Sequence, residues 1–202
     1  MPDRIDPQRD ALIVVDVQYD FLPGGPLPVR EGLEVIPVIN RLIPQFKHVF
    51  FTRDWHPPDH ISFAEFPQYV DKSWPPHAVM DTPGAQLHED LRLPEEPRIV
   101  NKGTDPQKEA YSGFQDTDLE QQLRVLNIER VFICGLATDY CVKHTLLDAR
   151  ARGFKAVLIE DAVRGVDNPP GSAAAAIQEM YLHGAQISNS EDLLPRSELA
   201  IK

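Results

Sequence analysis

The feature that most constrains the fold is a regular alternation of short, β-branched apolar runs with longer segments of helical periodicity. The apolar runs span residues 11–17, 48–52, 98–101, 131–134, 155–159 and 185–188, and the helical patterns span 33–46, 119–126, 172–183 and a segment through Cys141 to about 152. This order predicts an α/β fold, a three-layer sandwich with a mainly parallel sheet and helices on both faces. Ligands of such sheets bind beyond the carboxyl ends of the strands.

Composition narrows the classes of partner. The 202 residues are 42% hydrophobic and 25% charged, which predicts one soluble globular domain over 1–202. A net charge of −11 disfavours nucleic acid and anionic membranes as partners. The polar start of the chain and the short apolar runs predict neither a signal peptide nor a membrane span. With only two cysteines we expect no disulfide scaffold and a cytoplasmic setting.

Residues 54–97 interrupt the alternation. The segment is rich in proline, histidine and aromatic residues and has no clear period. Long irregular segments inside compact domains are usually functional or disordered, and the aromatic content argues against disorder. We therefore expect an ordered insertion that contributes to an active site.

A cysteine near the start of a predicted helix is the main candidate for chemistry. The strand at 131–134 leads into Gly-Leu-Ala and a Thr-Asp pair, and Cys141 follows in the first helical turn. The helix dipole and the free backbone N–H groups favour a thiolate there. Asp16 could exchange protons with this thiol, and Lys102 could orient Asp16. The backbone N–H of Cys141 and one from the Leu136–Ala137 turn could bind an oxyanion. This set suits acyl transfer through a thioester.

The insertion also carries a candidate metal site. Asp54 and His56 alternate along an extended segment, and His60, Glu65 and His77 follow. A carboxylate with neutral imidazoles suits Zn²⁺, Fe²⁺ or Mn²⁺. His60 and Glu65 are further candidate ligands, with a water as the alternative. Loop histidines that only form hydrogen bonds are the competing interpretation.

Three aromatic residues lie beside these polar motifs. Phe21 follows Asp16, Trp74 precedes His77, and Tyr111 follows Lys102. They could line a flat apolar pocket, although core packing is the usual role of such side chains.

Taken together and in order, these motifs resemble the nicotinamidase branch of the isochorismatase-like cysteine hydrolase family. The resemblance covers nearly the whole chain, through the segments 16–21, 52–57, 74–77, 82–85, 101–103, 111–114 and 135–142. It implies a six-stranded parallel sheet, a catalytic triad and a set of three metal ligands. The triad is Asp16, Lys102 and Cys141, the ligands are Asp54, His56 and His77, and Ala137 and Cys141 supply the oxyanion N–H groups after a cis peptide bond that precedes Ala137.

The resemblance further implies an activity. A divalent ion, Zn²⁺ before Fe²⁺ or Mn²⁺, would bind the ring nitrogen of nicotinamide, with the ring held between aromatic residues such as Phe21 and Trp74. Cys141 would attack the carboxamide, ammonia would leave with a proton from Asp16, and water would release nicotinate for NAD salvage. The family also implies a homo-oligomer.

Some positions depart from the family pattern, and other activities compete. Tyr19 replaces a usual Asn, Ala78 replaces a frequent Cys, and Asp81 stands where Gly or Asn is commoner. A related hydrolase acting on another small amide or carbamoyl compound is the main alternative. Isochorismate cleavage is disfavoured because it uses no cysteine nucleophile. The triad also argues against a non-catalytic binding protein.

Overall fold

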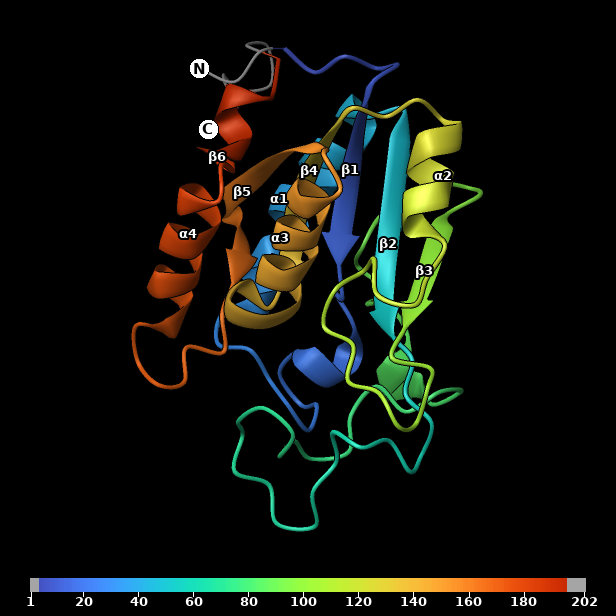
Figure 1. Ribbon diagram of the computed structural model, residues 1–202, viewed down its shortest axis with the longest axis vertical. Coiled ribbons are helices and arrows are strands. Elements are labelled where there is room, and N and C mark those ends of the chain that lie inside the picture. Colours follow the sequence, from blue (N-terminus) through green and yellow to red (C-terminus); the bar gives the residue numbers. More distant parts are fainter. Residues whose placement is uncertain (1–3, 196–202) are drawn as a thin grey trace.

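A six-stranded parallel sheet forms the centre of the computed structural model, which describes residues 4–195 (Figure 1). The strand order is β3-β2-β1-β4-β5-β6, and every neighbouring pair is parallel. The strands are β1 (Asp10–Val15), β2 (His48–Asp54), β3 (Arg98–Lys102), β4 (Arg130–Leu136), β5 (Lys155–Arg164) and β6 (Gln186–Ser188). The predicted α/β sandwich with a parallel, six-stranded sheet is confirmed.

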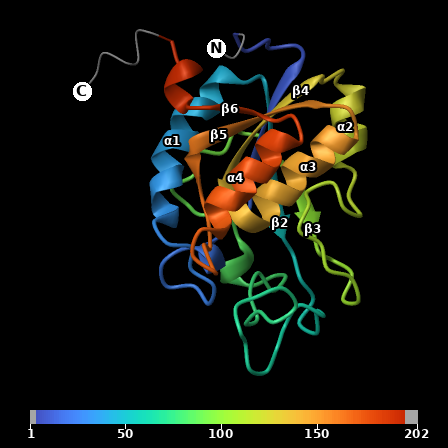
Figure 2. The ribbon, with the colours of Figure 1, turned by 60° about the vertical axis from the view of Figure 1, so that its left-hand side comes forward.

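Helices cover both faces of this sheet. They are α1 (Val35–Leu42), α2 (Leu119–Val125), α3 (Lys143–Ala151) and α4 (Ser172–Leu182). Helix α1 lies on one face, and α2, α3 and α4 lie on the other (Figure 2). Each face has its own apolar core, as the alternating side chains of β1 show: Leu12 and Val14 pack with α1, whereas Ile13 packs with the other three helices. Both faces of the strands are buried, which explains their continuous apolar runs.

The strand order places a topological switch point between β1 and β4. From β1 the chain passes to β2 on one side, and from β4 it continues to β5 on the other. Loops leave the sheet in opposite directions there and open a crevice beyond the strand ends. Glycine at position 135 allows the two strands to approach closely, because a Cβ there would lie 2.1 Å from the carbonyl oxygen of Val15. Asp16 follows β1 directly and so lies at the crevice.

Three elements differ in detail from the predicted ranges. The helix expected over 33–46 is α1 flanked by two 3-10 turns. Pro37 lies in the first turn of α1, where the missing N–H costs no helical bond, and Pro44 removes a backbone donor just after α1. The helix through Cys141 begins as a π-helical turn, Thr138–Val142, before α3. Strand β5 runs five residues beyond the predicted end at 159, since a register shift opposite Ile133–Gly135 lets Val163 pair with Gly135.

The insertion predicted at 54–97 is ordered and covers the carboxyl ends of the strands. In Figure 1 it forms the cyan-to-green loops beyond the lower edge of the sheet. Apart from the 3-10 turn Pro83–Ala85, the segment after Asp54 has no helix or extended strand before β3. Isolated bridges hold it together, including His56 with Val79 and Phe63 with Trp74. Within residues 4–195, no helix is long and apolar enough to cross a membrane.

Candidate active site

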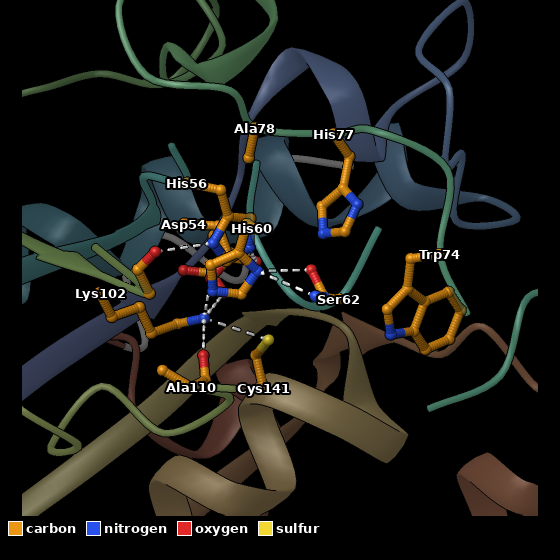
Figure 3. Close-up of polar contacts among 12 residues, drawn as sticks. Asp54, His56, His60, Ser62, Trp74, His77, Ala78, Lys102, Ala110 and Cys141 are labelled. Atoms are coloured by element: carbon orange, nitrogen blue, oxygen red, sulfur yellow. Dashed lines mark hydrogen bonds and ion pairs between the residues drawn. The ribbon is translucent and has the colours of Figure 1, made fainter. Parts of the chain in front are cut away.

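The three residues of the predicted triad meet at the switch point. Asp16 follows β1, Lys102 ends β3, and Cys141 lies in the π-helical turn after β4. Nζ of Lys102 lies 2.9 Å from Oδ2 of Asp16 and 3.3 Å from Sγ of Cys141. All three side chains are buried. Figure 3 shows the lysine and the cysteine pointing toward one another.

Lys102 is the central charge of the site. Besides Asp16 it forms an ion pair with Asp54, its partner across β2 and β3, and it donates to the carbonyl oxygen of Ala110 at 3.3 Å. Burial alone would lower its pKa, but Asp16 and Asp54 outweigh burial and hold the pKa of Lys102 well above its usual range. The ammonium group is therefore permanently charged beside the sulfur.

Asp16 is suited to accept a proton. Thr52 donates a hydrogen bond of 2.6 Å to Oδ1, while Oδ2 has no hydrogen bond from any described residue and faces Lys102. Burial raises the pKa of Asp16, against the opposing effect of Lys102. Oδ2 is the atom free to take up and return a proton.

Cys141 differs from the interpretation based on its helix position. Burial raises the pKa of the thiol well above its usual range, and nearby Asp16 and Asp54 add to this against Lys102. Desolvation and two carboxylates thus outweigh Lys102, so the resting sulfur keeps its proton. Attack then requires transfer of that proton to a base as the sulfur approaches a carbon atom.

A second group of side chains lies beside the triad. One carboxylate oxygen of Asp54 and one ring nitrogen each of His56 and His77 lie within 4.8 Å of one another, and all three residues are buried. Nδ1 of His56 bonds the carbonyl oxygen of Gly103 at 2.9 Å, and Nδ1 of His77 bonds that of Pro75 at 2.7 Å. Both rings therefore donate through Nδ1, which directs Nε2 into the group, and Nε2 of His56 lies 3.5 Å from Oδ2 of Asp54.

The electrostatics of this group fit a cation. Burial opposes the charge on Asp54, but Lys102 and His56 hold the pKa of Asp54 well below its usual range. Burial lowers the pKa of His77 to about 4, so this ring is neutral at pH 7. An ionised carboxylate and two directed imidazoles are a donor set for a divalent metal with open coordination positions.

The structure does not bring the other two candidate ligands into this group. Both ring nitrogens of His60 are engaged, Nδ1 with Oγ of Ser62 at 2.7 Å and Nε2 with the carbonyl oxygen of Lys108 at 3.0 Å. Its ring stacks on that of His56 with centroids 4.0 Å apart. Glu65 is exposed and lies outside the group. His60 thus supports a candidate ligand, and Glu65 points to solvent.

A narrow cavity joins the two groups. Its lining includes Asp16 and Cys141 of the triad and Asp54 and His77 of the second group, and ligand-type atoms of Asp16, Asp54 and Cys141 lie within 4.8 Å of one another. Its apolar walls include all three predicted aromatic residues, Phe21, Trp74 and Tyr111. The peptide bond between Leu136 and Ala137 is cis, as the resemblance implied, and both of these residues border the cavity.

Comparison with known proteins places the chain in a family. The isochorismatase domain matches residues 10–192. This chain belongs to the isochorismatase family. It is 39% identical to a nicotinamidase of Acinetobacter baylyi over 91% of this chain and 94% of that protein.

Solved structures of this family agree with that assignment. Pyrazinamidase of Pyrococcus horikoshii in complex with zinc has a TM-score of 0.82 and 48% identity, over 90% of this chain and 99% of the other. PnC1 from L. infantum in complex with nicotinate has a TM-score of 0.87 and 35% identity, over 96% of this chain and 99% of the other. The isochorismatase fold of this chain is therefore shared by proteins crystallised with a metal and with a pyridine carboxylate.

Two residues of this isochorismatase-family site were missed from the sequence. Gln18, fully buried, bonds both the backbone N–H and the carbonyl oxygen of Asp54 through its side chain. Asp20 accepts a hydrogen bond from the backbone N–H of Ala78, next to His77. Asp16 has φ of 48° and Tyr19–Phe21 is a 3-10 turn, so no strand or helix period of the sequence could have found them.

The three departures from the family pattern have simple local settings. The ring of Tyr19 packs against that of His88 at a tilt of 40°, and its hydroxyl accepts from the N–H of Glu89, so Tyr19 contacts the end of the insertion. Ala78 is buried, and Asp81 is exposed. Both adopt left-handed backbone, with φ of 45° and 63°. At position 81 this backbone explains why glycine or asparagine is the commoner residue.

Proposed function

We propose that this protein hydrolyses nicotinamide to nicotinate and ammonia, with Cys141 as the nucleophile. The observation that carries the proposal is the shared cavity, which is lined by the sulfur of Cys141, its candidate base Asp16, two of the three candidate metal ligands and several aromatic rings. A flat ring with an amide on one side and a basic nitrogen on the other matches these two groups. The nicotinamidase relatives and the nicotinate-bound structure support the same substrate.

The chain's own residues account for the proton transfers. As Sγ of Cys141 bonds to the amide carbon, its proton passes to Oδ2 of Asp16, and the backbone N–H groups of Ala137 and Cys141 receive the oxyanion. Asp16 returns the proton to nitrogen as the C–N bond breaks and ammonia leaves. Water then attacks the thioester, Asp16 takes its proton and gives it to the departing sulfur. Lys102 keeps Asp16 in place throughout.

A divalent ion fits the second half of the cavity, and we propose zinc. Asp54, His56 and His77 would hold it, and three ligands with open positions are typical of catalytic zinc. The ion would supply a Lewis-acidic position for the ring nitrogen. Zinc in the Pyrococcus horikoshii pyrazinamidase supports this choice. Elemental analysis of the purified protein distinguishes zinc from iron and manganese.

Other expectations from the sequence stay as proposals. We propose a single domain over 1–202, a cytoplasmic location and self-association. The two cysteines are unpaired and buried, which suits a reducing compartment. Light scattering on the purified protein measures the state of association.

Ammonia release from nicotinamide by the purified protein tests the function directly. We expect Cys141→Ala to abolish release without loss of fold, because only the sulfur is removed. We also expect chelation to reduce release and added zinc to restore it. Turnover of other small amides or carbamoyl compounds but not of nicotinamide would contradict the proposed substrate, and an active Cys141→Ala variant would exclude covalent catalysis.

A further inference from the structure

The six-residue segment 16–21 contributes more to the site than its catalytic aspartate. Asp16 faces Lys102, and Phe21 lines the cavity. Between them, Gln18 and Asp20 direct their side chains to backbone groups of other segments, at the end of β2 and in the insertion. One short stretch therefore contacts every part of the site that holds a candidate ligand or base.

Gln18 connects the end of β1 to the end of β2. Its Oε1 accepts from the N–H of Asp54 at 2.9 Å, and its Nε2 donates to the carbonyl oxygens of Asp54 at 2.9 Å and Ala85 at 2.8 Å. The side chain is fully buried. With both backbone groups of Asp54 bonded to one amide, the carboxylate of Asp54 leaves the strand in a fixed direction.

Asp20 fixes the backbone beside His77 in a similar way, through a hydrogen bond. Its Oδ2 accepts from the N–H of Ala78 at 2.7 Å, and Ala78 in turn accepts from the N–H of His56. Room for this carboxylate depends on Gly84, where an added Cβ would lie 2.0 Å from Oδ1 of Asp20. The glycine of the segment 82–85 is thus explained by the space that Asp20 occupies.

We propose that Asp20 is a positioning residue, which fixes the segment of the ligand His77 just as Gln18 bonds the backbone of Asp54. This inference rests on the metal site of the proposed function. Neither side chain is among the residues that line the cavity, so both act through the backbone of other residues. Outer-shell bonds of this kind keep ligands within the narrow geometry that a metal requires.

The experiment compares zinc affinity, measured by competition with a chelator, among four variants of the metal-free protein. Asp20→Ala removes the acceptor for Ala78, and Gly84→Ala displaces the carboxylate while leaving Asp20 in the chain. Asp20→Asn keeps an acceptor oxygen, and Asp90→Ala removes an exposed carboxylate elsewhere. Melting temperature without metal, kcat and KM are measured alongside.

We expect Asp20→Ala and Gly84→Ala to lose about 10- to 100-fold in zinc affinity, the usual effect of removing an outer-shell partner. Asp20→Asn and Asp90→Ala should stay close to the parent protein. Melting temperatures without metal measure any loss of stability that does not depend on zinc, and KM should rise more than kcat falls. Parental zinc affinity in Asp20→Ala, or an equal loss in Asp20→Asn, would overturn the inference. If the parent protein itself bound no zinc, the metal half of the proposed function would fail first.

Discussion

At the scale of single residues, the protonation of Cys141 is the feature with the most direct consequences. Helix position suggested a thiolate, whereas burial and two carboxylates favour the thiol. The difference arises because sequence shows the helix start but not the solvent exclusion around it. A neutral thiol beside Asp16 makes proton transfer part of the attack step.

This protonation state predicts slow alkylation of the resting protein. Burial raises the pKa of Cys141, so the thiolate fraction at pH 7 is smaller than that of an exposed cysteine, and it grows only as pH rises toward the raised value. We expect iodoacetamide to label the metal-free protein slowly at pH 7 and faster above the ordinary thiol pKa of about 8.5. Mass spectrometry gives the rate. Cys141→Ala serves as the control, since Cys134 is fully buried. Rapid labelling that is constant from pH 6 to pH 9 would contradict a protonated thiol.

The triad could be predicted from sequence for a reason specific to strands. Asp16, Lys102 and Cys141 each follow or end an apolar run, and parallel strands bring their carboxyl ends to one edge. Gln18 and His60 could not be assigned in the same way. Their roles depend on which backbone carbonyl each side chain reaches, and that follows from the path of the insertion.

At the scale of elements, the turn that carries Cys141 is tied to the loop after β5. Asp139, two residues before the nucleophile, accepts from the N–H groups of Val166 and Asp167, each at 2.9 Å, and from the hydroxyl of Ser172 at 2.6 Å. Val166 lines the cavity. One carboxylate therefore joins the π-helical turn, the cavity wall and the start of α4.

Removing this carboxylate should affect both stability and substrate binding. Hydrogen bonds to a charged acceptor contribute about 1.5–3 kcal/mol each, and water will replace part of the loss, so we expect Asp139→Ala to lower the free energy of unfolding by about 2–4 kcal/mol. KM should rise because Val166 is no longer held. Urea denaturation and steady-state kinetics measure the two effects. Asp139→Asn keeps one acceptor oxygen and should lose less. If Asp139→Ala were as stable as the parent protein, the hydrogen bonds of Asp139 would not be needed to hold the loop after β5.

At the scale of the whole molecule, the alternation of apolar runs and helical patterns predicted the layers of the sandwich, but it did not predict the contacts inside the insertion. Each strand must bury both faces, so its pattern is strong and local. The insertion is held by isolated bridges and by side chains that bond distant backbone, such as Tyr111, which accepts from Trp74 and donates to Asp71. These contacts follow no sequence period, and only the aromatic content of the segment indicated that it is ordered.

A bound ion should stabilise the whole fold, because its ligands come from β2 and from the insertion. An ion that binds only the folded state at 100 times its Kd adds about 2.7 kcal/mol. Burial disfavours charge on His56, but the effect of Asp54 outweighs burial and raises the pKa of His56 above 6.5. Protons therefore compete with the ion as pH falls through that value, and the added stability should be lost on the acid side. Melting temperatures with and without zinc from pH 5 to pH 8 measure this. An equal zinc effect across that range, or the same effect in His77→Ala, would contradict the ligand assignment.

The candidate catalytic residues and two of the candidate metal ligands come from different parts of the fold, and this separation has an evolutionary consequence. Asp16 and Cys141 follow the central strands β1 and β4, whereas His56 and His77 belong to a loop segment that contributes no strand to the sheet. We therefore expect mutations that shorten this loop to remove the proposed metal ligands and to change substrate choice while Asp16, Lys102 and Cys141 keep their places. Proteins that share this sheet can thus evolve different substrate preferences through changes in one surface segment, while the packing of the sheet and helices stays the same.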